Sequence, residues 1–184
     1  PEDPKSGDKL KKVANSIVEQ IDALTKIANE FSSFAKMPNP SEERVELMSL
    51  ITGVKQVFEG QSTITLESNA EKIFVVADKD QFVRVFNNLI KNAIQAIPSE
   101  REGMIEIRLQ HQKGKVTITV ADNGIGIEDA KQSKIFVPYF TTKSTGTGLG
   151  LAMVKQIVEN HKGSIDFDTV LEKGTTFTIV LPTE

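Results

Sequence analysis

The chain contains no cysteine and no long hydrophobic run. The first absence excludes disulfide bonds and thiolate metal sites, and it fits a reducing compartment. The second excludes a membrane-spanning helix, which needs roughly 20 apolar residues, and no signal peptide precedes the first predicted helix. We therefore expect no membrane contact by this chain. An initiator Met is also missing before Pro1, so we expect either a piece of a longer protein or a processed chain.

The sequence also has little excess charge of either sign. Its 22 basic and 25 acidic residues leave a net charge of -3 and a pI of about 5.6, which argues against a general nucleic-acid binder. The 39% hydrophobic and 26% charged residues are typical of a globular protein. A chain of 184 residues has room for one full domain plus an attached element.

Apolar residues recur every three or four positions from Leu10, which predicts a long helix that ends at Pro38 and Pro40. One interpretation is a single core-facing helix. The other, which we favour, is a bundle or dimer helix, because the stripe is long and little apolar material precedes it. Ser41 is then predicted to cap a second helix that Gly60 closes. The inward face of that second helix would contain Val45, Met48, Ile51, Val54, Val57 and Phe58.

From residue 62 onwards the pattern predicts mixed helices and strands. A hairpin is expected over 63–77, and a helix capped by Asp80 is expected to continue to about residue 97, before Pro98. Further strands are predicted at 104–110, 116–121, 164–168 and 175–181, with a helix at 148–160. This order predicts an α+β fold, a two-layer sandwich in which helices cover one face of a mixed, largely antiparallel sheet after a long N-terminal helix.

A carboxylate beside a glycine turn is the first chemical signal. Asp122 follows a predicted strand, and Gly124 and Gly126 remove side chains where a flat ligand would approach the backbone. Such a carboxylate can accept hydrogen bonds from an adenine amino group. Asp-Asn-Gly is also an ordinary turn sequence, so a structural turn remains the alternative.

A glycine loop that leads into a helix is the second signal. The segment Gly146-Thr147-Gly148-Leu149-Gly150 precedes the apolar run that starts at Leu151. Free amides and the helix dipole at such a start favour an anion, so we expect phosphates there. The loop lacks the ending of a P-loop, and a flexible linker is the alternative.

Asn88 and Asn92 lie one helical turn apart and share a helix face. Helix interiors disfavour Asn, so a ligand explains the pair better than helix propensity does. The amide oxygen of Asn92 suits Mg²⁺, which binds mainly through a nucleotide's phosphates. A satisfied polar pair under a neighbouring loop is the alternative.

Residues 128–147 show little regular periodicity, and loops of this length are usually functional lids or disordered. Lys143, Thr141 and Thr142 could meet a terminal phosphate, while Phe136 and Phe140 anchor the segment. A plain surface loop with a solvated lysine is the alternative.

These segments resemble, in order, the N box, the glycine boxes and the intervening F box of the catalytic ATP-binding domain of bacterial sensor histidine kinases. The resemblance covers roughly residues 41–182, and it extends to the wider Bergerat-fold family that includes gyrase, heat-shock protein ninety and MutL. It implies binding of ATP or ADP with Mg²⁺ held by Asn92, and adenine recognised by Asp122. The other residues implied at the nucleotide are Gly124, Gly126, Ile127, Phe136, Thr141, Thr142, Lys143, Gly146, Thr147, Gly148, Leu149, Gly150, Leu151 and Thr175.

Asn88 occupies the position where the hydrolytic members of the wider family carry a glutamate base. An amide cannot take a proton from water, so slow hydrolysis is expected, with the phosphoryl group kept for another acceptor. Asn88 and Lys143 are therefore the expected catalytic residues.

The N-terminal helix is similar to the second helix of the dimerisation and phosphotransfer hairpin of these kinases, most closely those of the NtrY type. The resemblance implies that residues 1–38 belong to this hairpin and residues 39–184 to the catalytic domain. It also implies a homodimer in the full-length protein, a response regulator as partner, and a cytoplasmic location in a membrane-anchored sensor. The phosphoacceptor histidine of that hairpin is not expected in this chain, since His111 and His161 lie elsewhere and are expected to have structural or solvent-exposed roles.

Other classes of function stay open at this point. An anti-sigma-factor type of serine kinase shares the boxes but does not need the long helix. An ATP-gated clamp or chaperone of the same superfamily would need a glutamate near Asn88. A helical interaction module without activity would leave the intact boxes unexplained.

Overall fold

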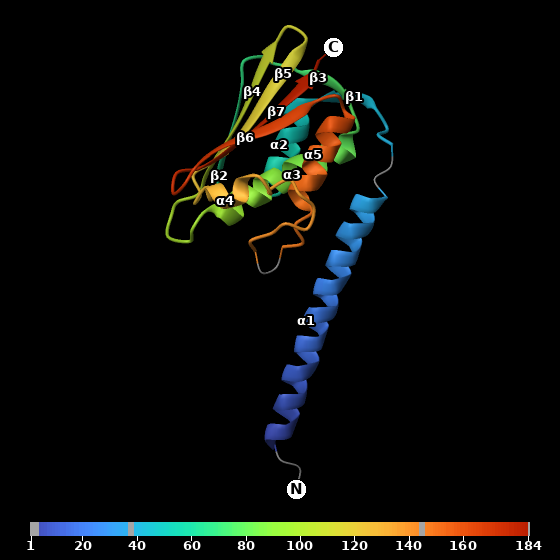
Figure 1. Cartoon of the computed structure of the whole chain (residues 1–184), viewed down its shortest axis with the longest axis vertical. Helices are drawn as coiled ribbons and strands as arrows, with labels where there is room; N and C mark the ends of the chain where they lie inside the picture. Colours follow the sequence, from blue (N-terminus) through green and yellow to red (C-terminus); the bar gives the residue numbers. More distant parts are fainter. Residues whose placement is uncertain (1–3, 37–38, 144–145, 184) are drawn as a thin grey trace.

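A computed structural model describes residues 4–36, 39–143 and 146–183. A long helix, α1 (Pro4–Ala35), extends away from a body in which the other elements pack together (Figure 1). Along the chain, the body consists of β1 (Glu43–Glu46), α2 (Leu47–Gln56), β2 (Thr63–Ser68), β3 (Phe74–Ala77), α3 (Lys79–Ala96), β4 (Met104–Gln112), β5 (Lys115–Asp122), α4 (Asp129–Gln132), α5 (Gly150–Asn160), β6 (Ser164–Val170) and β7 (Gly174–Pro182).

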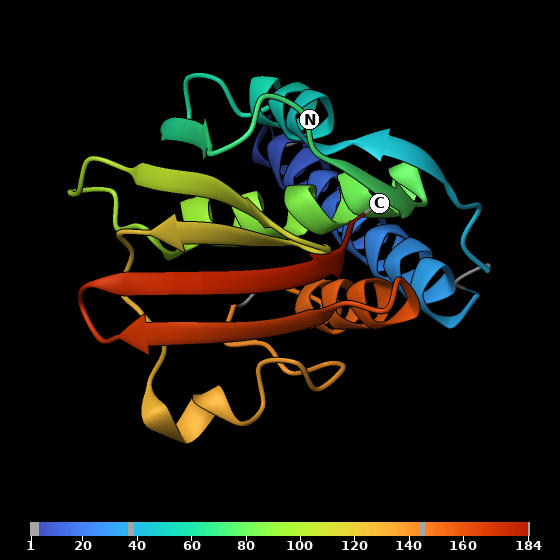
Figure 2. The same cartoon turned by 90° about the horizontal axis from the view of Figure 1, so that it is seen from above.

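Five strands form one mixed sheet in the order β2-β4-β5-β7-β6. Strand β2 runs parallel to β4, and the other neighbouring pairs in this sheet are antiparallel. The helices α3 and α5 lie side by side on one face of the sheet (Figure 2). The predicted α+β sandwich, with its helices on one face of a largely antiparallel sheet, is therefore confirmed.

The core lies between α3, α5 and the helix-facing side of the sheet. Alternate residues of β5, Val116, Ile118 and Val120, are buried, as the period of two in a strand requires. Phe82 and Phe86 of α3 are also fully buried. Each large side chain of this kind contributes roughly 1.5–3 kcal/mol of transfer free energy, so the contact between helix and sheet dominates stability.

Helix α3 begins at a cap that differs from the predicted one. Asp78, and not Asp80, is the N-cap, and its Oδ1 accepts a hydrogen bond from the Gln81 amide at 3.0 Å. Asp80 lies in the first turn, where the helix dipole stabilises a negative charge. The amide of Ser41 donates to Asp78 Oδ2 at 3.0 Å. Ser41 therefore ties the start of the body to α3, and the prediction that it caps a second helix is wrong.

The second predicted helix also begins later than expected. Strand β1, which includes the buried Val45, pairs antiparallel with β3, and α2 starts only at Leu47. Glu46 is its N-cap and accepts hydrogen bonds from the amides of Met48 and Ser49. Val57 was predicted to face inward but is 68% exposed. Pairing with a strand distant in sequence outweighs the helical pattern here, because that pairing satisfies the backbone groups of β1.

The predicted hairpin over residues 63–77 is wrong, although both of its strands exist. Strand β2 pairs with β4 in parallel, whereas β3 pairs with β1 in a separate two-stranded sheet. The turn signals between the two runs are local, but a strand's partner depends on segments far away in the sequence.

Helix α1 spans Pro4–Ala35 and so starts before the predicted Leu10. Its apolar stripe lies open to solvent: Ile17, Ile21, Leu24 and Phe31 are each about half exposed or more. Met37 and Pro38, which were expected at its end, lie outside the described residues. In the part of the chain that the structure describes, no helix combines the length and the apolar character needed to cross a membrane.

His161 has the structural role that the sequence indicates. The residue is only 4% exposed, and its ring packs edge-on against that of Phe82. The amide of Asp78 donates to His161 Nε2 at 3.0 Å, so Nδ1 carries the hydrogen and donates to the Ile157 carbonyl at 2.7 Å. The ring therefore joins the end of α5 to the cap of α3.

The orientation of α2 leads to a stability prediction. Val54 is 4% exposed and Val57 is 68% exposed. We expect Val54→Ala to lower the free energy of unfolding by about 2 kcal/mol, because buried methyl groups are lost. The matched Val57→Ala should change it by less than about 0.5 kcal/mol. Urea unfolding measures both values, and equal losses would show that the helix face is assigned wrongly.

Candidate functional site

A cavity of about 670 Å³ opens between α3, the end of β5, the segment before α5 and the turn that joins β6 to β7. This volume is within the range of small-molecule sites. All of the sequence motifs that indicated a ligand contribute to its lining. The predicted site residues among the lining are Asn88, Asn92, Asp122, Gly126, Ile127, Thr141, Thr142, Lys143, Gly146, Thr147, Gly148, Gly150, Leu151 and Thr175.

Three predicted site residues, Gly124, Phe136 and Leu149, lie outside this lining. A Cβ on Gly124 would lie 2.7 Å from the carbonyl oxygen of Ala96, so glycine is needed there for packing against α3 and not for ligand space. Leu149 is 1% exposed and forms part of the interior. The ring of Phe136 packs against those of Phe167 and Phe177, and so anchors the segment from outside the cavity.

The sequence did not indicate several other lining residues. Lys91 and Gln95 lie three residues after Asn88 and Asn92, so the helical period could have identified them. Leu171 and Glu172 come from the turn between β6 and β7, where no local pattern points to a ligand. The remaining lining residues are Ala96, Ile125, Glu128, Lys131, Ile135 and Phe177, together with Phe140, which the sequence assigned as an anchor of the segment.

Asp122 is held at the end of β5 by backbone amides. Its Oδ1 accepts hydrogen bonds from the amides of Gly124 at 2.8 Å and of Thr175 at 3.3 Å. Among the described residues, no hydrogen bond to its other oxygen, Oδ2, is found. Burial raises the pKa of Asp122, opposed by these two amides and by the charge of Lys143. The backbone therefore orients this carboxylate through one of its two oxygens.

Gly126 brings the turn after β5 against a second turn. Its φ of +73° is a left-handed conformation that suits glycine, and a Cβ there would lie 2.5 Å from the Val170 carbonyl oxygen. The amide of Glu172 donates to the carbonyl of Ile125 at 2.8 Å. These two contacts form one end of the cavity, with Ile125 and Leu171 as its apolar lining.

Asn92 already has a cationic neighbour in this conformation. Lys143 Nζ donates to Asn92 Oδ1 at 3.0 Å and to Gln95 Oε1 at 2.7 Å. Burial lowers the pKa of Lys143, the nearby charge of Lys91 lowers it further, and Asp122 raises it. The ammonium group therefore lies against the amide oxygen that the sequence assigned to Mg²⁺.

Asn88 is fixed on the same face of α3. Its Nδ2 donates to the carbonyl of Arg84 at 2.9 Å. A Cβ on Gly150 would lie 2.8 Å from Asn88 Oδ1, so the amide oxygen lies beside the first turn of α5. One interpretation of Asn88 and Asn92, a polar pair satisfied within the protein, accounts for the hydrogen bond to Arg84. The other interpretation, a bound ligand, needs space beside both side chains, and the cavity that both residues line provides it.

The first turn of α5 is open to an anion. The helix begins at Gly150, and its N-cap, Leu149, makes no side-chain cap hydrogen bond. Amides at such a start lack partners within the helix and favour an anion. The preceding segment is tied to the glycine loop, because the amide of Tyr139 donates to the Gly148 carbonyl at 3.0 Å. Tyr139 adopts a left-handed backbone with φ of +66°.

The environment of Asp122 leads to a pH prediction. Because its folded pKa is raised, the stabilisation from the protonated carboxyl is present below the unfolded pKa and is lost as pH rises through the folded pKa. Asp122→Asn keeps an acceptor for both amides but carries no charge. We therefore expect the stability of the variant relative to wild type to increase from about pH 3 to about pH 7. Urea unfolding at several pH values measures this difference, and a flat profile would contradict the prediction.

Known proteins are similar to this chain in sequence and in fold. The sensor histidine kinase ZraS of Escherichia coli is 35% identical over 96% of the chain and 39% of its own length. The solved catalytic domain of the histidine kinase ThkA has a TM-score of 0.70 and 32% identity, covering 77% of this chain and 95% of that domain. A structure of ThkA in complex with the response regulator TrrA has a TM-score of 0.77 and 29% identity, covering 100% of this chain and 53% of that one.

The similarity covers only part of each curated relative, and it includes a known family of ATPases. The chain spans only 28–40% of the length of the first curated relatives that it matches. Residues 77–184, more than half of the chain, match the family described as histidine kinase-, DNA gyrase B- and HSP90-like ATPase. The chain therefore belongs to the family of histidine kinase-, DNA gyrase B- and HSP90-like ATPases.

Proposed function

We propose that this chain is the catalytic ATP-binding part of a sensor histidine kinase. In this proposal it binds ATP with Mg²⁺ and donates the γ-phosphoryl group to a histidine outside the chain. The observation that carries the proposal is that Asn88, an amide, faces the start of α5 where a hydrolytic ATPase would need a carboxylate base. The kinase names of the relatives support the same conclusion.

The adenine would lie at the end of the cavity formed by the two turns. There Asp122 offers an acceptor to the amino group, and Ile125 and Leu171 offer apolar surface. Thr175, which is 5% exposed, donates its amide to the carboxylate and so supports the same contact. This arrangement favours adenine over guanine, since guanine has a carbonyl in place of the amino group.

The phosphates would lie between the glycine loop and α3. The free amides at the start of α5 and the cations Lys91 and Lys143 complement the negative charge. The other two lining carboxylates, Glu128 and Glu172, form ion pairs with Lys131 and Arg101. We assign neither of them the role of a base.

Asn92 would hold Mg²⁺ through its amide oxygen, and the nucleotide's phosphates would supply further ligands. The donor set fits this assignment, because an amide oxygen is a hard ligand and faces the phosphate end. Among the described residues, no cluster of His, Asp or Glu offers a metal site made of protein alone. The ion, when bound, would neutralise charge on the transferred group. Lys143 would then leave Asn92 for the terminal phosphate.

In the transfer itself, a histidine nitrogen would bond to the γ-phosphorus while the bond from that phosphorus to the β–γ bridging oxygen breaks, and ADP leaves. The residues of this chain would position the phosphates and would not take a proton from water, because Asn88 cannot act as a base. Segment 136–143, which contributes Phe140, Thr141, Thr142 and Lys143 to the cavity lining, would limit the access of water.

The wider assembly belongs to the same proposal. Residues 1–38 would be the second helix of a dimerisation and phosphotransfer hairpin, and 39–184 the catalytic domain. The exposed stripe of α1 would pair with helices of a homodimer. A response regulator would receive the phosphoryl group, by analogy with the complex that ThkA forms with the response regulator TrrA. We also propose a cytoplasmic location in a membrane-anchored sensor, since ATP and response regulators occur there.

The role of Lys143 can be tested with two nucleotides. Lys143→Met should weaken binding of a non-hydrolysable ATP analogue by about tenfold or more, because a charged hydrogen bond to the terminal phosphate is lost. ADP lacks that phosphate, so its affinity should change by less than about threefold. Calorimetry with Mg²⁺ measures both. Equal weakening of the two nucleotides would argue against a contact with the terminal phosphate.

The proposed reaction predicts where label from ATP appears. We expect the full-length protein, incubated with ATP labelled at the γ-phosphate, to carry label that is lost in acid and stable in alkali, as phosphohistidine is. Asn92→Ala, which lacks the proposed Mg²⁺ ligand, should reduce this label strongly. Label that is stable in acid would instead support the serine-kinase alternative. Rapid release of phosphate without labelled protein would support an ATP-driven clamp.

A further inference from the structure

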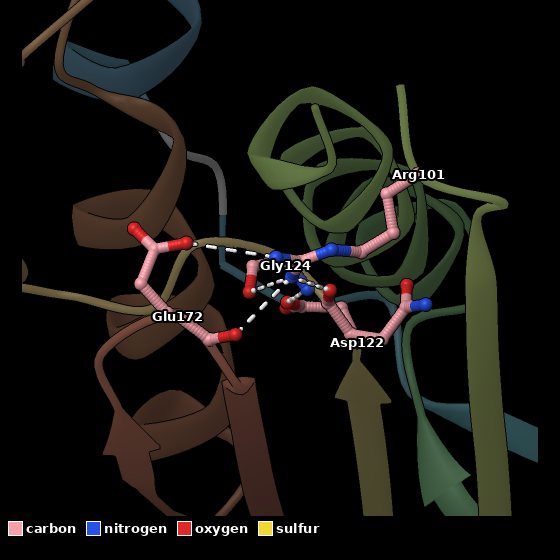
Figure 3. A network of polar contacts seen from close by, with 5 residues as sticks. Arg101, Asp122, Gly124 and Glu172 are labelled. Carbon is pink, nitrogen blue, oxygen red and sulfur yellow. Dashed lines mark hydrogen bonds and ion pairs between the residues drawn. The ribbon is translucent and has the colours of Figure 1, made fainter. Parts of the chain in front are cut away.

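Arg101 lies in the loop between α3 and β4, outside every motif that the sequence singled out. Its guanidinium group contacts both turns at the end of the cavity where the adenine would bind (Figure 3). Nη1 lies 2.6 Å from the Asn123 carbonyl oxygen, 2.9 Å from that of Gly124 and 3.3 Å from that of Glu172. Nη2 lies 3.5 Å from Glu172 Oε2.

These contacts join three segments that are far apart in the sequence. The turn after β5 supplies two carbonyl oxygens, and the turn between β6 and β7 supplies the third. Three carbonyl oxygens that converge without a cation would repel one another and would lack hydrogen-bond partners. The guanidinium group removes this penalty, because it provides both a positive charge and fixed donors.

The loop that carries Arg101 is itself held firmly against the turn after β5. The side chain of Asn123 donates to the Glu102 carbonyl at 2.9 Å and accepts from the Met104 amide at 3.0 Å. The amide of Ile125 donates to the Ala96 carbonyl at 2.9 Å. The loop that carries Arg101 is therefore fixed to the turn after β5, and the guanidinium group holds the turn between β6 and β7 in place.

Gly124 connects Arg101 to the carboxylate. Its carbonyl oxygen accepts from the guanidinium, while its amide donates to Asp122 Oδ1 at 2.8 Å. A change in the orientation of this turn would therefore move the donor that orients the Asp122 carboxylate. Arg101 also contacts the Glu172 carbonyl oxygen in the turn between β6 and β7. This contact lies next to the hydrogen bond from the Glu172 amide to the Ile125 carbonyl.

We propose that Arg101 is a positioning residue for adenine recognition: it clamps the turn after β5 to the turn between β6 and β7 and thereby holds the Asp122 carboxylate toward the base. This inference rests on the proposed function, because it presumes that the base lies at Asp122. Arg101 does not itself line the cavity. It acts through the two turns, and its effect should be confined to the base end of the ligand.

The test compares two ligands that differ only at the group read by Asp122. One is a non-hydrolysable ATP analogue, and the other is the same analogue with purine in place of adenine, which lacks the amino group. Wild type should prefer the first by about tenfold or more, since a hydrogen bond to a charged acceptor is at stake. In Arg101→Met this preference should fall to within about threefold. Calorimetry measures all four affinities.

Two further variants and one further ligand separate positioning from stability. Inorganic triphosphate with Mg²⁺ probes the phosphate end alone, and Arg101→Met should bind it within about twofold of wild type. Arg101→Lys retains a charge and three donors, so it should recover part of the preference. Arg108→Met serves as the matched control, because Arg108 on β4 forms exposed ion pairs with Glu67 and Glu106 and should leave the preference unchanged.

The possible outcomes are distinct. A wild-type preference retained in Arg101→Met overturns the proposal. A loss of triphosphate binding as large as the loss of adenine preference also overturns it, because Arg101 would then stabilise the whole domain. If Arg101→Met does not fold, Arg101→Lys decides: no reduction in preference overturns the proposal, and a partial reduction with intact triphosphate binding supports it. Failure of wild type to bind the ATP analogue would instead refute the proposed function.

Discussion

The packing of α3 against the sheet is the contact on which both the core and the candidate site depend. One face of this helix buries Phe82, Phe86 and Ile90, while the adjoining face presents Asn88 and Asn92 to the cavity. Because both faces belong to one helix, the packing of the apolar face on the sheet also fixes where the two amide side chains lie. Stability and ligand geometry are therefore linked through a single element.

The cavity holds two ionisable groups whose burial is not fully compensated by the protein. The pKa of Asp122 is raised and that of Lys143 is lowered, each chiefly by burial, so both are shifted toward the neutral form. The proposed nucleotide would supply what each group lacks, an amino donor for the carboxylate and a phosphate for the ammonium. Its affinity would then derive partly from charges that the folded chain has already removed from water.

The sequence predicted those features that depend on local periodicity. The helix α3, the strands β4, β5, β6 and β7 and the glycine loop before α5 all follow from residues close together in the chain. The strand β1 was missed because it exists only through its pairing with β3. Glu172 and Arg101 were missed for a similar reason, since both reach the site through turns that only the tertiary fold brings together. Gly124 was assigned to ligand space although packing on Ala96 explains it.

The left-handed backbone of Tyr139 stores free energy next to the glycine loop. For a residue with a Cβ, this conformation costs roughly 1–2 kcal/mol, and the hydrogen bond from its amide to the Gly148 carbonyl holds it in place. If the loop rearranges and this bond is lost, nothing in that contact keeps Tyr139 strained. A rearrangement of the glycine loop would therefore release the strain of Tyr139, so the backbone conformations of these two segments are coupled through one hydrogen bond.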